Sequence, residues 1–290
     1  MDMDTDMDMD MDMDTDITIS NIPSRVFIIP YRDRVNDKKM FIEKMTTILD
    51  DDDDYDYDDD YDDDGDDDDT NTKNNKYEFY FSHQYDTRPF NRGAMKNIGF
   101  LAIKDKYPDH YKDITFIFHD IDTIPSEKGL IDYNTTHGIV KHYYGFKYAL
   151  GGIFSIKGTD FEKSKGFPNF WGWGIEDNAM NDRCLEAGLK IDRSQFYPIE
   201  DKRILRYFDG FQRTISRKDS LIYKQNGHDS MLDLKNIKWN IHNEYINVTN
   251  FDCKMKPDEQ IYAPIDIRTT KKLIVPRETE FRRNWNMFKR

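Results

Sequence analysis

Cysteine is almost absent from this chain: Cys184 and Cys253 are its two cysteines in 290 residues. Two cysteines cannot build the disulfide framework of small secreted domains, so we expect free thiols in a reducing compartment. No stretch approaches 18 consecutive apolar residues, so the sequence predicts no transmembrane helix and no membrane anchor. No Lys or Arg precedes Arg25, and no apolar segment opens the chain, so we expect no signal peptide. Together these absences predict a cytoplasmic protein that is not secreted.

Glycine-rich phosphate loops are also missing, since neither GxxxxGK nor GxGxxG occurs. A bound nucleotide would therefore be held by other donors, of which arginine is the most suitable. No DNA- or RNA-binding module can be recognised, so we expect no nucleic acid partner.

Charge is distributed very unevenly along the chain. The formal net charge is −14, but residues 1–16 and 50–69 contain 24 of the 56 acidic residues and no basic one. The other 32 acidic residues face 42 Lys and Arg, which leaves a body with a net charge of about +10 that can attract phosphate. Asp runs repel themselves and cannot bury apolar area. We therefore expect disorder in the Asp- and Met-rich residues 1–24 and in an insertion at 50–76.

Apolar runs alternate with amphipathic segments in the first half of the chain. Strands are predicted at 25–30, 77–82 and 113–122, and helices at 31–49 and 91–107. Such alternation predicts an α/β domain with βαβ units and a parallel sheet, whose ligands bind at the carboxyl ends of the strands. Pro30, Ser82 and Asp120 to Asp122 lie at such ends.

The pattern changes after Gly138. We predict a strand at 150–156, a short helix from Thr159 or Asp160, and a helix at 176–188. A further short helix in "HDSMLDLKN" and a late strand pair turning near Asn243 complete a domain at 25–252, and 253–290 form a basic tail.

Asp120 and Asp122 follow the apolar segment "ITFIF". In an extended chain, residues i and i+2 point to the same side, so we expect the two carboxylates to meet. Such a pair suits a hard divalent cation shared with a substrate phosphate. The alternative is a solvated loop that turns after a strand.

The segment "FPNFWGWGIEDNAM" (167–180) places Trp171 and Trp173 among glycines, directly before Glu176 and Asp177. Glycine lets such a segment hinge, and sugars stack on aromatic rings. At a helix start the helix dipole favours an ionised carboxylate, which can accept a proton from an alcohol. The alternatives are an apolar plug in a turn and ordinary acidic residues in the first turn of a helix.

Arginines accompany these predicted strand ends. Arg32 and Arg34 occur in "IPYRDR", and Arg92 occurs in "FNRG". Guanidinium groups offer paired donors to phosphate, so the three favour a nucleotide-diphosphate site. The alternative for each is a surface salt bridge.

Five segments in order, "IIPYRDR", "FNRGAMKNIGF", "FIFHDID", "LGGIFSIKGTDFEKSKGFPNFWGWGIEDN" and "SMLDL", resemble the β-1,4-galactosyltransferase family, glycosyltransferase family 7. The resemblance covers about residues 25–252 without the Asp insertion. It implies a GT-A type glycosyltransferase fold, a single Rossmann-like domain with a mixed, mainly parallel central sheet. It also implies inverting transfer from a UDP-sugar with Mn²⁺ as cofactor.

The resemblance also assigns roles by position. It implies that Asp177 is the catalytic base with Glu176 beside it, and that Asp122 is a metal ligand. It implies nucleotide-sugar contacts at Arg32, Arg34, Phe90, Arg92, Asp120, Gly152 and the mobile Trp173, and acceptor contacts at Asn178 and Trp171.

Three positions depart from the family pattern. Tyr207 stands where a metal-binding histidine is usual, so the second metal ligand is open among Tyr207, Asp209 and His228, and His228 can also be a surface histidine. Asn178 replaces the third acid of an E-D-D sequence. Ala149 replaces a tyrosine, which leaves more room near the donor's C2 group and extends the donor choice to UDP-GalNAc.

The sequence thus predicts an inverting glycosyltransferase that moves a galactose or N-acetylgalactosamine from a UDP-sugar to a glycan or glycoprotein hydroxyl. The alternatives are a non-catalytic carbohydrate- or nucleotide-sugar-binding module and a metal-dependent phosphoesterase. The Asp tracts and the scarcity of cysteine are similar to those of giant-virus proteins, which would place the enzyme in a host cytoplasm or virion.

Overall fold

The computed structural model describes residues 22–50, 77–207, 213–216, 218–219, 229–257 and 262–265. Most of the predicted Asp-rich segments and of the basic tail lie outside these ranges, as do Asp209 and His228. Within the described residues, no helix is long and apolar enough to cross a membrane. Cys184 and Cys253 are both free thiols, as predicted.

The described part contains a nine-stranded mixed sheet in the order β11-β12-β2-β1-β3-β6-β5-β7, with β8 also paired to β5. β12, β2, β1 and β3 run parallel, as do β5, β7 and β8, whereas β6 is antiparallel to both its neighbours and β11 to β12. The predicted mixed, mainly parallel sheet is confirmed. Its strands are β1 (Arg25–Tyr31), β2 (Tyr77–Gln84), β3 (Thr115–His119), β5 (Ile139–Gly145), β6 (Ile153–Lys157), β7 (Lys190–Asp192), β8 (Tyr197–Pro198), β11 (Lys235–His242) and β12 (Tyr245–Asp252).

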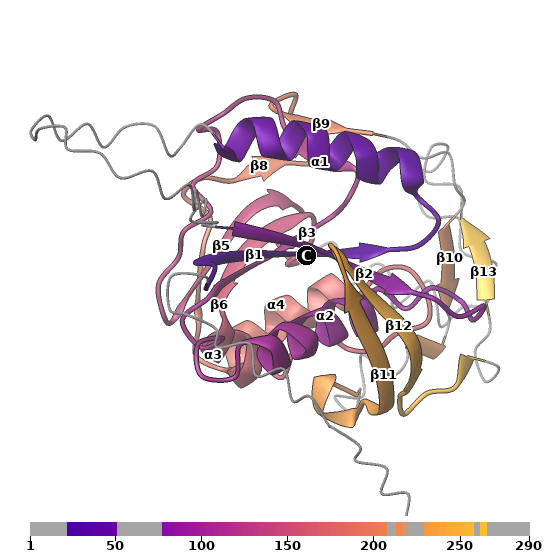
Figure 1. Ribbon diagram of the computed structural model, residues 1–290. Coiled ribbons are helices and arrows are strands. Elements are labelled where there is room, and N and C mark those ends of the chain that lie inside the picture. The colour runs from indigo at the N-terminus through magenta and orange to yellow at the C-terminus, as the bar shows by residue number, and fades with distance from the viewer. Residues whose placement is uncertain are drawn as a thin grey trace, which may run out of the picture.

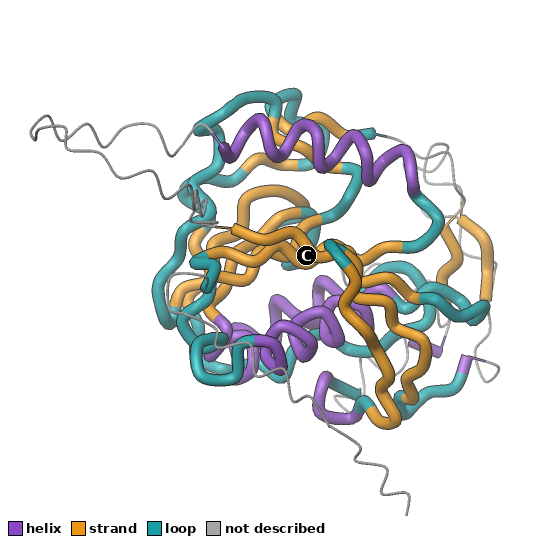
Figure 2. The backbone as a smooth tube through the Cα atoms, viewed as in Figure 1, coloured by secondary structure: helices purple, strands orange, loops and turns teal. Residues whose placement is uncertain are grey.

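Helices cover both faces of this sheet (Figure 1). α1 (Val35–Leu49) lies on one face, and α2 (Arg92–Lys106), α3 (Gly158–Lys163) and α4 (Glu176–Glu186) lie on the other, an arrangement that the tube in Figure 2 repeats. A 3-10 helix, Met231–Asp233, precedes the β11–β12 hairpin. Three layers of this kind are the expected form of an α/β domain.

Strand alternation explains the two cores. Along β1, Val26 and Ile28 pack into the cluster on the α2 and α4 side, whereas Phe27 and Ile29 pack into the cluster on the α1 side. Successive side chains of a strand point to opposite faces, so a strand buried on both faces has to be apolar throughout. The apolar run at 25–30 was therefore predictable as a central strand.

Two short strand pairs lie outside the main sheet. β4 (Thr123–Pro125) pairs with β9 (Ile204–Arg206), and β10 (Arg213–Ser216) pairs with β13 (Tyr262–Ile265). The first pair brings Tyr207 beside Asp122, because the Tyr207 backbone N–H donates to the Asp122 carbonyl at 2.8 Å.

One long strand of the main sheet, β5, was not predicted. β5 contains Lys141 and His142 between apolar residues, and these polar side chains interrupt the apolar pattern. The strand predicted at 113–122 also ends earlier than expected, at His119.

Candidate functional site

The candidate site forms where the end of β3 meets the first residues of two helices. Asp120 directly follows β3, Arg92 begins α2, and Glu176 and Asp177 begin α4. Asn91 caps α2, since its side chain accepts a hydrogen bond from the Ala94 N–H at 2.9 Å. The cap fixes the first turn of α2 and so fixes the direction in which Arg92 leaves it.

Arg92 connects three carboxylates in this site. Its Nη1 lies 2.8 Å from Glu176 Oε1 and 2.9 Å from each carboxylate oxygen of Asp177. Its Nη2 donates to Asp120 Oδ1 at 2.5 Å. A guanidinium can bind several oxygens at fixed angles, so Arg92 orients the strand-end acid and the helix-start acids together.

Lys96 adds a second buried cation. Its Nζ lies 3.2 Å from Asp177 Oδ1 and 4.4 Å from the centre of the Phe167 ring, and the residue is 1% exposed. The sequence prediction did not include Lys96. A signal was present, because Lys96 lies four residues after Arg92 on the same helix and therefore on the same face.

Burial and charge compete to set the pKa values here. Burial raises the pKa of Asp120, but the charges of Arg92 and Lys96 outweigh it and bring the pKa down to about 2. Burial, followed by the negative charge of Asp177, raises the pKa of Glu176. Burial, followed by the charge of Arg92, lowers the pKa of Lys96. The site therefore keeps Asp120 ionised and makes Glu176 harder to ionise than an ordinary glutamate.

Gly151 and Gly152, the diglycine turn, contact Asp177 and Asp120. A Cβ placed on Gly151 would lie 2.4 Å from Asp177 Oδ2, so only a glycine fits beside this carboxylate. The Leu150 N–H donates to the Asp177 carbonyl at 2.8 Å, and the Asp120 N–H donates to the Gly152 carbonyl at 2.9 Å. Residues 150–152 thus connect Asp120 and Asp177 through the backbone.

The tryptophan segment is anchored beside the acids. Trp171 is buried, stacks on Phe251 with ring centres 5.5 Å apart, and donates its Nε1–H to the Met255 carbonyl at 2.6 Å. Packing against Phe251 therefore covers one face of the Trp171 ring, and the acceptor contact at Trp171 stays a prediction. Trp173 is half-buried.

Asp219 also holds the tryptophan segment. Its Oδ2 accepts a hydrogen bond from the Gly172 N–H at 2.7 Å, whereas its buried Oδ1 has no hydrogen-bond partner among the described residues. Burial raises the pKa of Asp219 to about 7. Sequence reasoning missed this residue, because nothing near it in the sequence indicates that it contacts Gly172.

Two family models match consecutive parts of the chain. The N-terminal region of glycosyl transferase group 7 matches residues 71–134, and the N-terminal domain of galactosyltransferase matches residues 136–207. β-1,4-Galactosyltransferase 5 of Mus musculus is 30% identical over 180 residues, 59% of this chain and 45% of the mouse protein. β-1,4-Galactosyltransferase 2 of Cricetulus griseus is 34% identical over 142 residues, 46% of this chain and 36% of the hamster protein.

The chain belongs to the β-1,4-galactosyltransferase family. It spans about half the length of the first of these relatives. Among solved structures, Drosophila β-1,4-galactosyltransferase 7 with xylobiose has a TM-score of 0.58 and 18% identity, over 80% of this chain and 95% of that one. A mutant of the same enzyme, solved with manganese, UDP-Gal and xylobiose, has a TM-score of 0.56 and 19% identity over the same shares. These likenesses confirm the predicted GT-A type fold.

The backbone of the D-x-D segment is not extended, which corrects the geometry expected from the sequence. β3 ends at His119, and residues 121 and 122 form a turn in which the Thr123 N–H donates to the Asp120 carbonyl at 3.3 Å. Asp120 consequently contacts Arg92, whereas Asp122 Oδ2 lies 3.8 Å from Arg34 Nη1. The extended geometry assumed for 120–122 was wrong because the strand stops before it.

The described groups around Asp122 are a poor set of ligands for a divalent metal. The Asp122 side chain is 13% exposed, and the guanidinium of Arg34 is its neighbour. Tyr207, which stands where the resemblance implies a histidine ligand, is bonded to Asp122 through the backbone. Within the described ranges, no three His, Cys, Asp or Glu side chains gather to hold a metal ion. The residues described do not fit a complete manganese site, and the candidates Asp209 and His228 lie outside them.

The predicted nucleotide arginines have different neighbours. Arg32 donates from Nη1 to the Arg88 carbonyl at 2.6 Å and from Nη2 to the Asp86 carbonyl at 3.1 Å, and its guanidinium lies 5.4 Å from the Phe90 ring centre. Arg32 therefore orders the loop that leads to Phe90 and Arg92. Arg34 donates to Asp37 at 2.7 Å as well as facing Asp122.

Two exposed aromatic rings lie in the loop that precedes Leu150. Phe146 and Tyr148 stack with centres 5.4 Å apart and are 50% and 47% exposed. Asn178 Nδ2 donates to the Tyr148 carbonyl at 3.3 Å, so the predicted acceptor residue Asn178 holds this loop. Ala149 follows Tyr148 and is buried.

Proposed function

We propose that this protein is an inverting glycosyltransferase that moves a hexose from a UDP-sugar to a hydroxyl group of a glycan. The observation that carries the proposal is the bridge formed by Arg92. It joins Asp120, at the carboxyl edge of the sheet where α/β proteins bind nucleotides, to the acid pair at the start of α4. Membership of the galactosyltransferase family makes galactose the first donor sugar to test.

In this mechanism Asp177 acts as the general base. It takes the proton of the acceptor hydroxyl while that oxygen attacks C1 of the donor sugar. The bond from C1 to the β-phosphate oxygen breaks, UDP leaves with the electron pair, and attack from the opposite face inverts C1. Arg92 orients the carboxylate for this step, and Trp173 closing over the donor would exclude water that otherwise hydrolyses it.

Whether the reaction requires manganese is a question for the assay. The Drosophila relative was solved with manganese, and Asp122 is the family's ligand position, but the described residues supply no complete metal site. No step above depends on a metal. Turnover measured with Mn²⁺, with Mg²⁺ and with chelator decides whether a cation is required.

The donor and acceptor also belong to the proposal. The resemblance implies a tyrosine at the position of Ala149, and alanine is the smaller side chain, so we propose that UDP-GalNAc is accepted beside UDP-Gal. A glycan is favoured as acceptor because the exposed Phe146–Tyr148 pair lies beside Asn178, and sugars stack on aromatic faces. A cytoplasmic location remains a prediction from the sequence.

The test is a UDP-release screen over several UDP-sugars and sugar acceptors. We expect acceptor-dependent UDP release by the full chain. Asp177→Asn should lose transfer by about 10²-fold or more, because general-base catalysis contributes that much, and should still bind UDP in calorimetry. Normal turnover by Asp177→Asn would refute Asp177 as the base.

One observation favours a second candidate, a nucleotide-sugar-binding module without catalysis. The family's metal-ligand position Asp122 has Tyr207 beside it instead of histidine. UDP binding without any UDP release, over all donors and acceptors in the screen and with each cation, would support this module against the transferase.

A further inference from the structure

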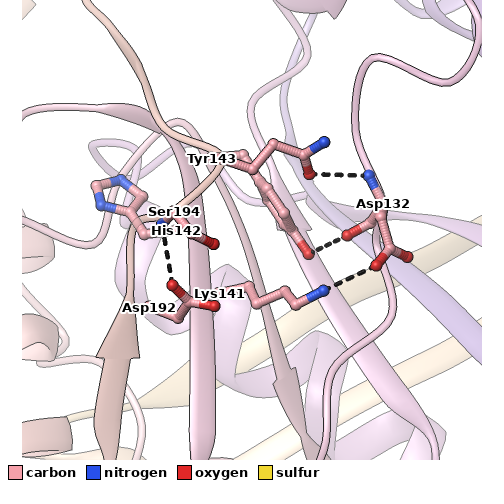
Figure 3. Close-up of a pocket in the computed structure, with 7 residues that line it drawn as sticks. Asp132, Lys141, His142, Tyr143, Asp192 and Ser194 are labelled. Atoms are coloured by element: carbon pink, nitrogen blue, oxygen red, sulfur yellow. Dashed lines mark hydrogen bonds and ion pairs between the residues drawn. The ribbon is translucent and has the colours of Figure 1, made fainter.

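His142 lies behind the candidate site and takes no part in the mechanism above. It is on β5, is 1% exposed, and packs its ring 4.9 Å from that of Phe196. Figure 3 shows His142 at one side of a pocket of about 270 Å³, with Lys141 and Tyr143 bonded to Asp132 at the other side. The pocket includes none of the predicted site residues.

The hydrogen bonds of His142 define its tautomer. Its Nε2 lies 3.0 Å from the Tyr144 carbonyl and 3.1 Å from the Gly151 carbonyl, so Nε2 carries the proton. Its Nδ1 accepts a hydrogen bond from Arg193 Nε at 3.1 Å. Two carbonyl acceptors on one side and a guanidinium donor on the other require a neutral ring. Burial and the charge of Arg193 lower the pKa of His142 to about 4, which agrees with this assignment.

Arg193 connects this histidine to the helix that carries the acids. Its Nη2 donates to Asn181 Oδ1 on α4 at 2.9 Å. The contacts therefore form a closed series of residues. The series runs from α4 through Arg193 and His142 to Gly151, and from Gly151 back to Asp177 at the start of α4.

This series of contacts constrains the distance between Gly151 and the start of α4. Gly151 lies directly against the Asp177 carboxylate, and Leu150 is bonded to the Asp177 backbone. Movement of the Gly151 carbonyl would move the surface on which the carboxylate rests. A misplacement of about 1 Å at a reacting group can reduce turnover about 10²-fold.

We propose that His142 and Arg193 are positioning residues for the transfer reaction, which hold Gly151 under the carboxylate of Asp177. This inference rests on the proposed function and extends it to two residues that do not touch the substrate.

The test compares His142→Phe with His142→Gln in the full chain. Phe keeps a flat ring against Phe196 but has no donor for the two carbonyls, whereas the Gln amide can donate from nearly the position of Nε2. We expect His142→Phe to lower kcat about 10- to 100-fold, with the UDP Kd changed less than about threefold. His142→Gln should recover most of that loss. Lys141→Met is the matched control. Lys141 lies in the same strand as His142, but its side chain pairs with Asp132 in the preceding loop, so kcat should stay unchanged.

Arg193→Met provides a second route if His142→Phe does not fold. It should lower kcat by about 3- to 10-fold, and the double variant should be no slower than His142→Phe alone, because both act through one chain of contacts. Wild-type kcat in folded His142→Phe, or a Gln variant as slow as the Phe variant, would overturn the inference. Absence of UDP release by the wild-type protein would instead overturn the proposed function.

Discussion

Arg92 and Asp177 are joined by two hydrogen bonds of 2.9 Å from a single nitrogen, 85 residues apart in sequence. Truncating this arginine to methionine leaves Asp120 and the acid pair with Lys96 as their remaining cation. Breaking a buried ion pair from one side costs about 3–5 kcal/mol. We expect Arg92→Met to lower the free energy of unfolding by this amount in urea titrations and to lower kcat/KM by at least about 10²-fold.

Arg203→Met is the control for this change. Arg203 pairs with Asp201 at the surface, where its side chain is 57% exposed. A solvent-exposed ion pair contributes little to stability, so stability and activity should both stay near wild type. Equal losses for the two variants would contradict a special role for Arg92.

The fold was predictable from the sequence where its signals are local. The apolar runs of β1 and β3 and the amphipathic segments of α1 and α2 were recognisable because each carries its own periodicity. Asp177 and Arg92 were also predicted individually. Their pairing was not, because no pattern within one segment reports contacts between residues 85 positions apart.

Other site features were missed for physical reasons that differ. β5 was overlooked because His142 and Lys141 break its apolar pattern. The polar ring of His142 is buried because it is hydrogen-bonded to the Gly151 carbonyl. Lys96 was passed over although a lysine on the inward face of a helix needs a carboxylate partner. The strand before the D-x-D segment ends at His119 and a turn follows at 121–122, and strand length is difficult to predict to within a residue.

Gly151 offers a direct test of the contact with Asp177. A Cβ there would meet Oδ2 at 2.4 Å and the Asp177 Cγ at 2.9 Å. The carboxylate would have to move, so we expect Gly151→Ala to lower kcat at least tenfold and to cost about 1–3 kcal/mol of stability. Gly129→Ala is the control: it meets no atom within 4 Å, so its φ of 69° should cost stability but leave kcat unchanged. A fully active Gly151→Ala enzyme would show that Asp177 is not held in this position during turnover.

Asp219 predicts a pH dependence of stability. Its pKa is about 7 in the folded protein, against about 3.9 for an ordinary Asp, so the folded state binds the proton more tightly. Its contribution is therefore fully present below about pH 4 and is lost as the pH rises through 7. Asp219→Asn keeps an acceptor for the Gly172 N–H and cannot ionise. Relative to wild type, the variant should gain on the order of 3–4 kcal/mol between pH 4 and pH 8. Urea unfolding across this range measures the difference, and a difference that does not change with pH would contradict the buried ionisation.

Ile175 is the residue before the acid pair and adopts φ 75° and ψ −28°, a left-handed conformation that is rare for a β-branched side chain. This conformation costs a non-glycine residue about 1–2 kcal/mol. Ile175→Gly and Ile175→Ala both delete nearly the whole side chain, so their difference isolates the backbone. We expect the Gly variant to be more stable than the Ala variant by about 1 kcal/mol in denaturant unfolding. At Ala179, inside α4, the order should be reversed, with Ala179→Gly costing about 1 kcal/mol or more. Equal stability of the Ile175→Ala and Ile175→Gly variants would show that Ile175 is not strained before Glu176.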